Sequence, residues 1–266
     1  MNKKQTKGVK LFVDEEGGKH EKVPDKVPSI KELRDLCGRK RNIWFWRDRI
    51  NRFLSIYITK LFLLLGAVPN HATFFVFLFG ILSAVFYSFG FYTYSLIGLL
   101  FHHLSFVMDA VDGEVARYKK MMSLKGVYLD LMNHILVTPL ILVGITIGSF
   151  MHPPAYLPFS GIVYLIAGST AGFFYIMNNF LRVKKYEMYS KSGNFDKLKE
   201  MVSSGKEEST SWVKNEIIFL LSFEIFNLMF FFTILNLVPI LVLFYGALYF
   251  VSFVVKFYRS YKSVTD

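Results

Sequence analysis

Long uncharged runs constrain this chain more than any other feature. Residues 72–92 (ATFFVFLFGILSAVFYSFGFY) contain no charged side chain over 21 positions. A helix of about 20 apolar residues crosses the roughly 30 Å hydrocarbon core of a bilayer, so this run is long enough to span it. The hydrophobic content of the 266 residues, 53%, agrees with such a fold. We therefore expect an integral membrane protein.

Similar runs predict five further helices, and the expected fold class is all-α, a bundle of six transmembrane helices. The spans are expected at about residues 72–92, 94–117, 126–150, 157–181, 216–235 and 237–256. Gly144 and Gly148 lie four residues apart, a spacing that lets membrane helices approach closely. This spacing serves packing within the chain or a dimer interface, and we expect the first.

An amphipathic segment precedes the first span. Residues 43–66 mix an apolar stripe with three arginines and begin near Trp44 and Trp46. This pattern is typical of a helix that lies in the membrane interface, with aromatic rings at the level of the headgroups. Pro69 then interrupts the helix, and Asn70 or Thr73 is expected to cap the next one.

Basic residues gather on one side of the predicted spans. The connections near residue 93, at 150–157 and at 236–239 contain no lysine or arginine, whereas the 182–214 segment is rich in them. Cytoplasmic loops carry the excess of lysine and arginine in membrane proteins. Both termini and the charged loops are therefore expected on the cytoplasmic side.

The chain divides accordingly into three parts. Residues 1–46 are expected to form a basic cytoplasmic arm, 47–260 the membrane domain and 261–266 a cytoplasmic tail. The net charge of +11 suits a surface that faces anionic lipid headgroups. Because the basic residues follow the membrane edges, nucleic acid is not an expected partner. The one cysteine, Cys37, excludes an internal disulfide, and its thiol is expected to be inert.

Ionisable side chains interrupt the second and third spans. Asp109 and Asp112 share one helical face, and Asp130 and His134 share a face of the next helix. Charged groups inside a span are costly and face a bundle interior or a watery cavity, with partners. The short connection at 118–124 makes the two helices antiparallel neighbours. Three carboxylates would then meet and repel one another unless a hard cation such as Mg²⁺, Mn²⁺ or Ca²⁺ binds.

Small residues beside these carboxylates leave space for a ligand. Gly113 and Ala116 follow the first two carboxylates on the same face, and Gly126 precedes the third. Arg117 lies about one turn away and suits a phosphate oxygen. The residues alone predict a metal-assisted phosphate site at the cytoplasmic membrane face, with a structural ion-pair network as the alternative. Glu114 points to the helix flank and is not expected to act as a ligand.

The pattern resembles the signature of the CDP-alcohol phosphotransferase (CDP-alcohol phosphatidyltransferase) family, D-x-x-D-G-x-x-A-R-x8-G-x-x-x-D-x-x-x-D. Every element from Asp109 to Asp130 matches in identity and spacing. Two further stretches resemble the P-N-x-x-T motif and the amphipathic helix of the family, namely AVPNHAT and NRFLSIYIT. The similarity covers about residues 47–260.

The resemblance implies a six-helix membrane bundle, usually a homodimer. A divalent metal held by the motif carboxylates would bind the diphosphate of a CDP-linked substrate, and CMP would leave as an alcohol attacks. By position, the implied metal ligands are Asp109, Asp112 and Asp130. The nucleotide and its phosphates would contact Asp112, Gly113, Ala116, Arg117 and Gly126.

This chain departs from the family at His134, where the signature has a fourth aspartate. That aspartate is implied to deprotonate the acceptor hydroxyl, and sometimes to bind a second metal. Histidine can take either role, so His134 is the candidate base, with Asp130 beside it, and a further candidate ligand. Because a neutral imidazole adds no negative charge, binding of a second Mg²⁺ is less favoured. The softer ion Mn²⁺ becomes somewhat more favoured at this site. Loss of turnover is the alternative.

We expect a transferase of phospholipid biosynthesis that depends on Mg²⁺ or Mn²⁺. It would move a phosphatidyl group from CDP-diacylglycerol to a polar alcohol or polyol phosphate, with release of CMP, and the basic rim favours an anionic acceptor. Two alternatives stay open: transfer from a soluble CDP-alcohol to a lipid hydroxyl, and a non-catalytic membrane protein that binds CDP-nucleotides. A transporter is disfavoured, because its polar groups would lie at mid-membrane.

Overall fold

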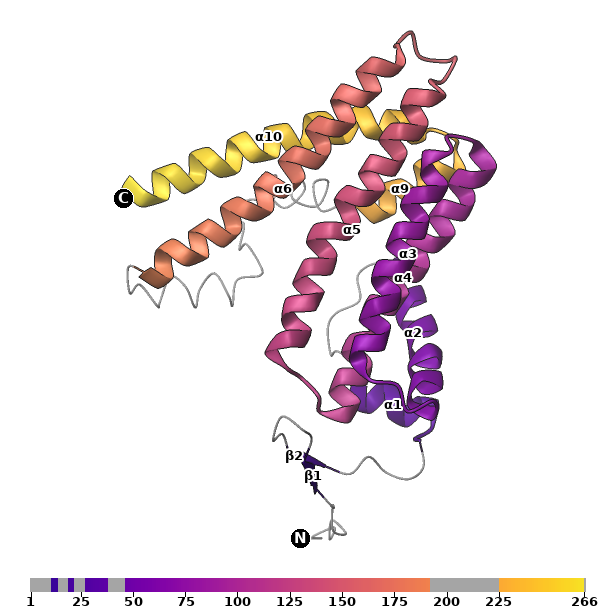
Figure 1. Cartoon of the computed structure of the whole chain (residues 1–266), viewed down its shortest axis with the longest axis vertical. Helices are drawn as coiled ribbons and strands as arrows, with labels where there is room; N and C mark the ends of the chain where they lie inside the picture. The colour runs from indigo at the N-terminus through magenta and orange to yellow at the C-terminus, as the bar shows by residue number, and fades with distance from the viewer. Residues whose placement is uncertain (1–10, 14–18, 22–26, 38–45, 192–224, 266) are drawn as a thin grey trace. The chain divides into compact units, whose positions relative to one another are not determined.

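The computed structural model describes residues 11–13, 19–21, 27–37, 46–191 and 225–265 (Figure 1). Two short strands, β1 (Leu11–Val13) and β2 (Lys19–Glu21), pair antiparallel, with Phe12 opposite His20. The sequence pattern does not predict this pairing within the N-terminal arm. All the other regular elements of the described residues are helices.

Eight helices follow in the described part of the chain. They are α1 (Ile30–Cys37), α2 (Trp46–Leu64), α3 (Pro69–Ser88), α4 (Tyr92–Lys119), α5 (Leu124–Met151), α6 (Gly161–Lys191), α9 (Ile225–Ile234) and α10 (Val238–Thr265). Five of them, α3, α4, α5, α6 and α10, are long and apolar enough to cross a membrane. The chain is therefore a multi-pass membrane protein, as its uncharged runs predict.

The predicted span at 216–235 lies partly outside the described residues. Its described portion contains α9, which has 10 residues. Most of the predicted 182–214 loop also lies outside them, although α6 continues to Lys191 and so includes the beginning of that segment. The predicted tail at 261–266 continues α10 as far as Thr265.

The turn between α2 and α3 has a defined geometry. Gly66 adopts a φ of 71°, and the Ala67 amide bonds the Phe62 carbonyl at 2.9 Å, which ends α2 in a Schellman motif. Helix α3 then begins at Pro69, a residue suited to the first helical position because it has no amide hydrogen to satisfy. The prediction that Asn70 or Thr73 caps α3 is wrong, since both lie inside the helix.

The described residues fall into two compact units. The first takes its residues from Met1–Gly80 and His102–His134, and the second from Ile81–Phe101 and Ile135–Asp266. The core of the first unit joins α1, α2, α3 and α4. Its buried members are Leu33, Cys37, Ile56, Leu63, Ala72, Val76, Met108, Val111 and Val115. A segment of the predicted cytoplasmic arm is thus part of this core.

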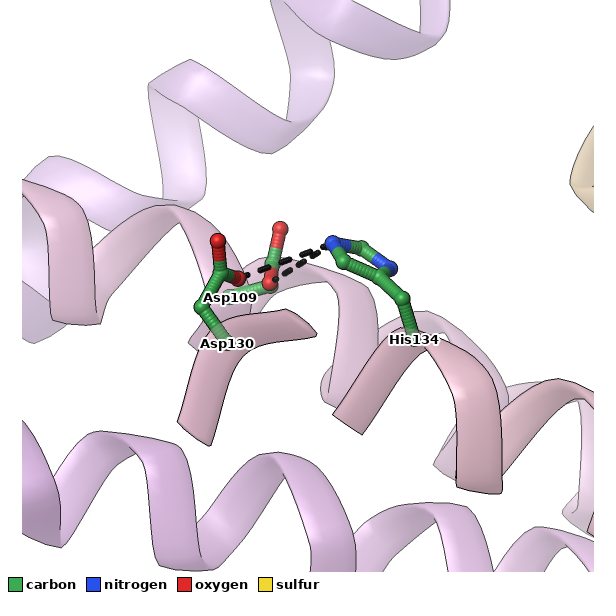
Figure 2. A group of neighbouring side chains, drawn as sticks. All are labelled: Asp109, Asp130 and His134. Atoms are coloured by element: carbon green, nitrogen blue, oxygen red, sulfur yellow. Dashed lines mark ion pairs between the residues drawn. The ribbon is translucent and has the colours of Figure 1, made fainter. Parts of the chain in front are cut away.

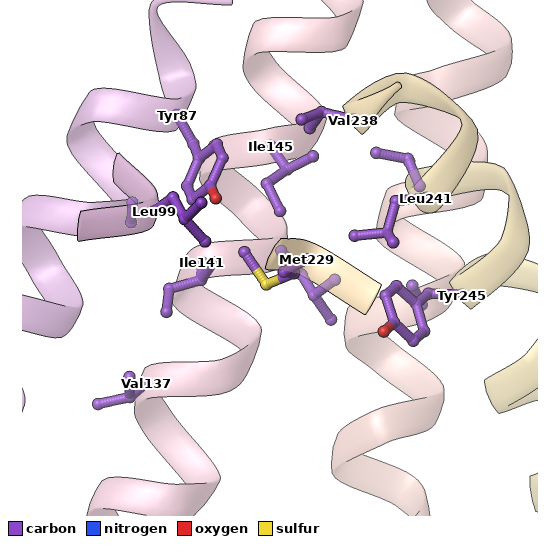
Figure 3. Packing of buried hydrophobic residues seen from close by; sticks show 13 residues of the cluster. Tyr87, Leu99, Val137, Ile141, Ile145, Met229, Val238, Leu241 and Tyr245 are labelled. Carbon is purple, nitrogen blue, oxygen red and sulfur yellow. The ribbon is translucent and has the colours of Figure 1, made fainter. Parts of the chain in front are cut away.

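The second unit has its own apolar core, to which α3, α4, α5, α6, α9 and α10 contribute (Figure 3). The Tyr87 hydroxyl lies 2.9 Å from the Thr233 hydroxyl, so the buried phenol is satisfied within the core. Helices α6 and α10 run side by side (Figure 1), and the Asn178 amide donates to the Tyr249 carbonyl at 3.2 Å.

The glycines of α5 allow a close approach to α3 within this second unit. A Cβ at Gly144 would collide with the Ala84 carbonyl, and one at Gly148 with the Tyr87 carbonyl. Intramolecular packing, which the spacing predicts, is therefore the use that the structure makes of both glycines.

Candidate functional site

Two carboxylates and an imidazole converge in the first unit, where α4 carries Asp109 and α5 carries Asp130 and His134 (Figure 2). The His134 Nε2 atom lies 3.7 Å from Asp109 Oδ1 and 3.6 Å from Asp130 Oδ1. The i, i+4 spacing on α5 places Asp130 and His134 one turn apart, so both reach the same point. The spacing argument from the sequence predicts this meeting.

The three side chains are partly open to their surroundings. Side-chain exposure is 27% for Asp109, 48% for Asp130 and 53% for His134. One ligand atom from each lies within 4.8 Å of the others. Two carboxylate oxygens and an imidazole nitrogen form a donor set that suits a divalent cation, and nitrogen makes it somewhat softer than oxygen alone. The residues therefore fit the metal that the sequence predicts.

Asp112 is predicted as a third carboxylate ligand, but it is not a member of this close group. Its Oδ2 atom accepts a hydrogen bond of 3.1 Å from the Thr73 hydroxyl of α3. Asn133, the residue before His134, donates from its amide to the Thr73 carbonyl at 3.3 Å. Thr73 thus joins α3 to both helices of the motif.

Sequence reasoning missed this use of Thr73 and of Asn133. The sequence pattern identifies Thr73 only as the last residue of the P-N-x-x-T motif and as a helix cap, and it does not single out Asn133. The signal in the sequence is an amide within a predicted span, next to the ionisable His134, and the structure buries this amide. Polar groups in buried positions need hydrogen-bond partners, so Asn133 was a candidate for bridging helices.

Glu114 lies outside the group of possible ligands and has a different role. Its side chain is buried, at 5% exposure, and Ser55 and Thr59 of α2 donate hydrogen bonds of 2.8 and 2.6 Å to its two oxygens. The two donors lie four residues apart and so share one face of α2. The Glu114 carboxylate therefore holds the amphipathic helix α2 against α4.

Arg117, the predicted phosphate ligand, contacts the N-terminal segment of the chain. Its Nε donates to the Cys37 carbonyl at 2.6 Å. The side chain also lies across Gly113, because a Cβ there would stand 3.1 Å from Arg117 Nη1. Gly113 is predicted to make room for the nucleotide, and the structure shows that its missing side chain also makes room for Arg117.

The remaining small residues are placed as follows. Gly126 lies in the first turn of α5, where its amide donates a hydrogen bond of 3.1 Å to Ser123 Oγ, the side-chain cap of that helix. A Cβ at Gly126 would meet only that Oγ, at 3.4 Å. Ala116 lies half-buried in α4, one residue before Arg117.

A comparison with family models places this geometry among known proteins. The model of the CDP-alcohol phosphatidyltransferase family matches residues 66–204, which include every motif residue from Asp109 to His134. A comparison with curated proteins finds no match. The family match extends over half of the chain and contains the residues that converge in the structure. The chain belongs to the CDP-alcohol phosphatidyltransferase family of membrane transferases.

Proposed function

We propose that this protein transfers a phosphatidyl group from CDP-diacylglycerol to a polar alcohol or polyol phosphate, releasing CMP, as a step of phospholipid biosynthesis. Membership of the family implies a CDP-linked donor and an alcohol acceptor. The convergence of Asp109, Asp130 and His134 within the family motif is the observation that carries the proposal.

Asp109, Asp112 and Asp130 would hold the divalent ion, Mg²⁺ or Mn²⁺, with His134 as a further candidate ligand beside Asp109 and Asp130. When bound, the ion would neutralise charge on the donor diphosphate as the phosphoanhydride bond breaks. Thr73 orients the Asp112 carboxylate through the hydrogen bond at 3.1 Å. Partners of this kind fix the direction in which a ligand presents its oxygens.

His134 would act as the base. Its Nε2 would accept the proton of the acceptor hydroxyl, and the Asp109 and Asp130 oxygens at 3.7 and 3.6 Å would stabilise the imidazolium that forms. The same nitrogen cannot bind metal and accept a proton at once, so ligation would have to use Nδ1 or leave the base role to water. Asp130, one turn from His134, would complete the catalytic pair.

The donor and acceptor would meet at the cytoplasmic face. Lys119, Lys120 and Lys125 lie between Asp112 and Asp130 in the chain, at the junction of α4 and α5. Basic residues at a membrane edge attract anionic groups and lie on the cytoplasmic side. This supports an anionic polyol phosphate as acceptor, both termini in the cytoplasm and α2 in the membrane interface. We further propose a homodimer, as in the family.

The test is CMP release by the purified protein in lipid vesicles, with CDP-diacylglycerol, Mg²⁺ or Mn²⁺, and polyol or polyol-phosphate acceptors. Asp109→Asn should abolish release, whereas Glu187→Gln, which changes an exposed carboxylate of α6, should not. Release of CMP only with a soluble CDP-alcohol and diacylglycerol would favour the alternative, in which the donor is soluble and the acceptor is a lipid hydroxyl. Binding of CDP without release of CMP from any donor would contradict the proposal.

A further inference from the structure

We propose that α1 is a positioning element of the phosphate site, which orients Arg117 through the Cys37 carbonyl. The inference rests on the proposed function, because it assigns Arg117 to the diphosphate of the CDP-linked donor. Helix α1 lies before residue 66, where the family match begins. The chain would thus use a segment of its own N-terminal arm to prepare a family site.

The contact itself is a strong one. Arg117 Nε donates to the Cys37 carbonyl oxygen at 2.6 Å, and hydrogen bonds from an ionised donor are about twice as strong as those between neutral groups. Cys37 is the last residue of α1, and the final carbonyls of a helix have no partner within it. They also carry the partial negative charge of the helix dipole. A guanidinium is therefore a favourable partner at this position.

Helix α1 is held firmly enough to act as a support. With 8 residues it is too short to be stable alone, so its formation depends on packing. Leu33 and Cys37 supply that packing, since both are completely buried in the core of the first unit. Ser29 and Glu32 form a capping box at its start, and the Arg34 guanidinium lies 5.7 Å from the centre of the Phe53 ring.

A second contact limits the direction of the Arg117 side chain. Long side chains on a helix point back toward its N-terminus, and Arg117 does so across Gly113. Asp112 and Asp109 lie in that direction along α4. The Cys37 bond uses the Nε–H, so recognition of a phosphate in this orientation falls to the terminal nitrogens of the guanidinium. The terminal nitrogens therefore lie beside Gly113, one of the residues predicted to contact the nucleotide and its phosphates.

This arrangement would save part of the cost of ordering a long side chain when the donor binds. Loss of α1 docking should then raise the KM for the CDP-linked donor more than the KM for the acceptor. A merely structural role of α1 would affect the amount of folded protein and not this ratio.

The contact can be tested without any turnover, because Cys37 is the only cysteine of the chain. Its alkylation rate reports how often α1 detaches. Arg117→Ala should raise that rate roughly 10- to 100-fold, the range expected when a charged hydrogen bond is lost. Lys119→Ala is the matched control, since Lys119 donates from the same helix to a different carbonyl, that of Gly66, at 3.0 Å. Equal rates in the two variants would overturn the inference.

A double-mutant cycle on CMP release tests whether α1 acts on the donor through Arg117. Leu33→Asp should lower kcat/KM for the donor about 10-fold or more, while Leu36→Asp, on the exposed side of α1, should change it less than about threefold. In the Arg117→Ala background, Leu33→Asp should add little. A full multiplication of the two effects would mean that α1 acts independently of Arg117 and would overturn the inference.

The two experiments separate the inference from the proposed reaction. Absence of CMP release by the unchanged protein would contradict the proposed function and, with it, the assignment of Arg117 to the donor. The alkylation rates would still decide whether α1 holds Arg117. Leu33→Ala gives the same comparison with a milder change, so a folding failure of Leu33→Asp does not end the test.

Discussion

Thr59 of α2 donates a hydrogen bond of 2.6 Å to the buried carboxylate of Glu114 on α4. Thr59→Val keeps the shape of the side chain and removes the donor, so one carboxylate oxygen loses its partner. We expect the free energy of unfolding to fall by about 1–3 kcal/mol, the usual cost of an unsatisfied buried group. Denaturant unfolding in detergent micelles would measure it.

The control for this prediction is Thr170→Val on α6. Thr170 is half-buried, and its hydroxyl donates to the Ile166 carbonyl of its own helix, at 2.7 Å. Its replacement should change the unfolding free energy by less than about 0.5 kcal/mol. Equal losses for the two variants would show that the Glu114 contact adds nothing beyond an ordinary helix substitution.

Thr73 offers a test of the proposed ligand Asp112. Thr73→Val removes the donor that orients the carboxylate, and we expect kcat/KM for CMP release to fall about 10-fold, as for other partners of metal ligands. Thr73→Ser keeps a hydroxyl at the same place and should retain most of the activity. Steady-state kinetics at several metal concentrations would distinguish weaker metal binding from slower chemistry. Full activity of Thr73→Val would contradict the role.

The sequence predicts the membrane helices well because hydropathy acts over whole segments. The predicted span at 94–117 corresponds to α4, which the structure places at Tyr92–Lys119. It predicts the ends less well. The span expected to end at residue 181 continues as α6 to Lys191, because polar residues can extend a helix after the apolar run has ended. The sequence does not predict α1, because only two of its side chains, Leu33 and Cys37, are buried and they form too short an apolar pattern.

The candidate site shows the same division. Helical spacing predicts that the face with Asp109 and Asp112 meets the face with Asp130 and His134, because each face is defined within a few residues of sequence. The structure brings Asp109, Asp130 and His134 into one close group and leaves Asp112 outside it. The contacts of Arg117 with Cys37 and of Asp112 with Thr73 join residues 80 and 39 positions apart. Such pairs depend on how the helices pack, and a single sequence contains no signal for them.

His134 should determine which metal supports the reaction. A chelator should abolish CMP release, and Mn²⁺ should restore it at least as well as Mg²⁺, because the donor set includes a nitrogen. His134→Asp replaces that nitrogen with oxygen and should shift the preference toward Mg²⁺ by about 10-fold. The ratio of kcat/KM with the two metals measures the shift. An unchanged ratio would place His134 outside the metal site.

Cys37 gives a prediction about stability at high pH. Burial raises the pKa of its thiol from an ordinary value of 9.0 to about 11. The unfolded chain therefore loses this proton first, and the folded state becomes relatively less stable as the pH rises from about 9 to about 11. The melting temperature of the wild type should therefore fall more steeply across this pH window than that of Cys37→Ala. Parallel curves would contradict the burial effect.

Gly144 and Gly172 should respond differently to replacement by alanine. A methyl group at Gly144 would collide with the Ala84 carbonyl of α3, and backbone cannot move aside as a flexible side chain can. We expect Gly144→Ala to lower the free energy of unfolding by about 1–3 kcal/mol, the range for overpacking. At Gly172 no atom lies within 4 Å of the added carbon, and alanine favours a helix over glycine by about 1 kcal/mol. Gly172→Ala should therefore be neutral or stabilising, and a loss at Gly172 as large as at Gly144 would mean that close packing is not what requires glycine in α5.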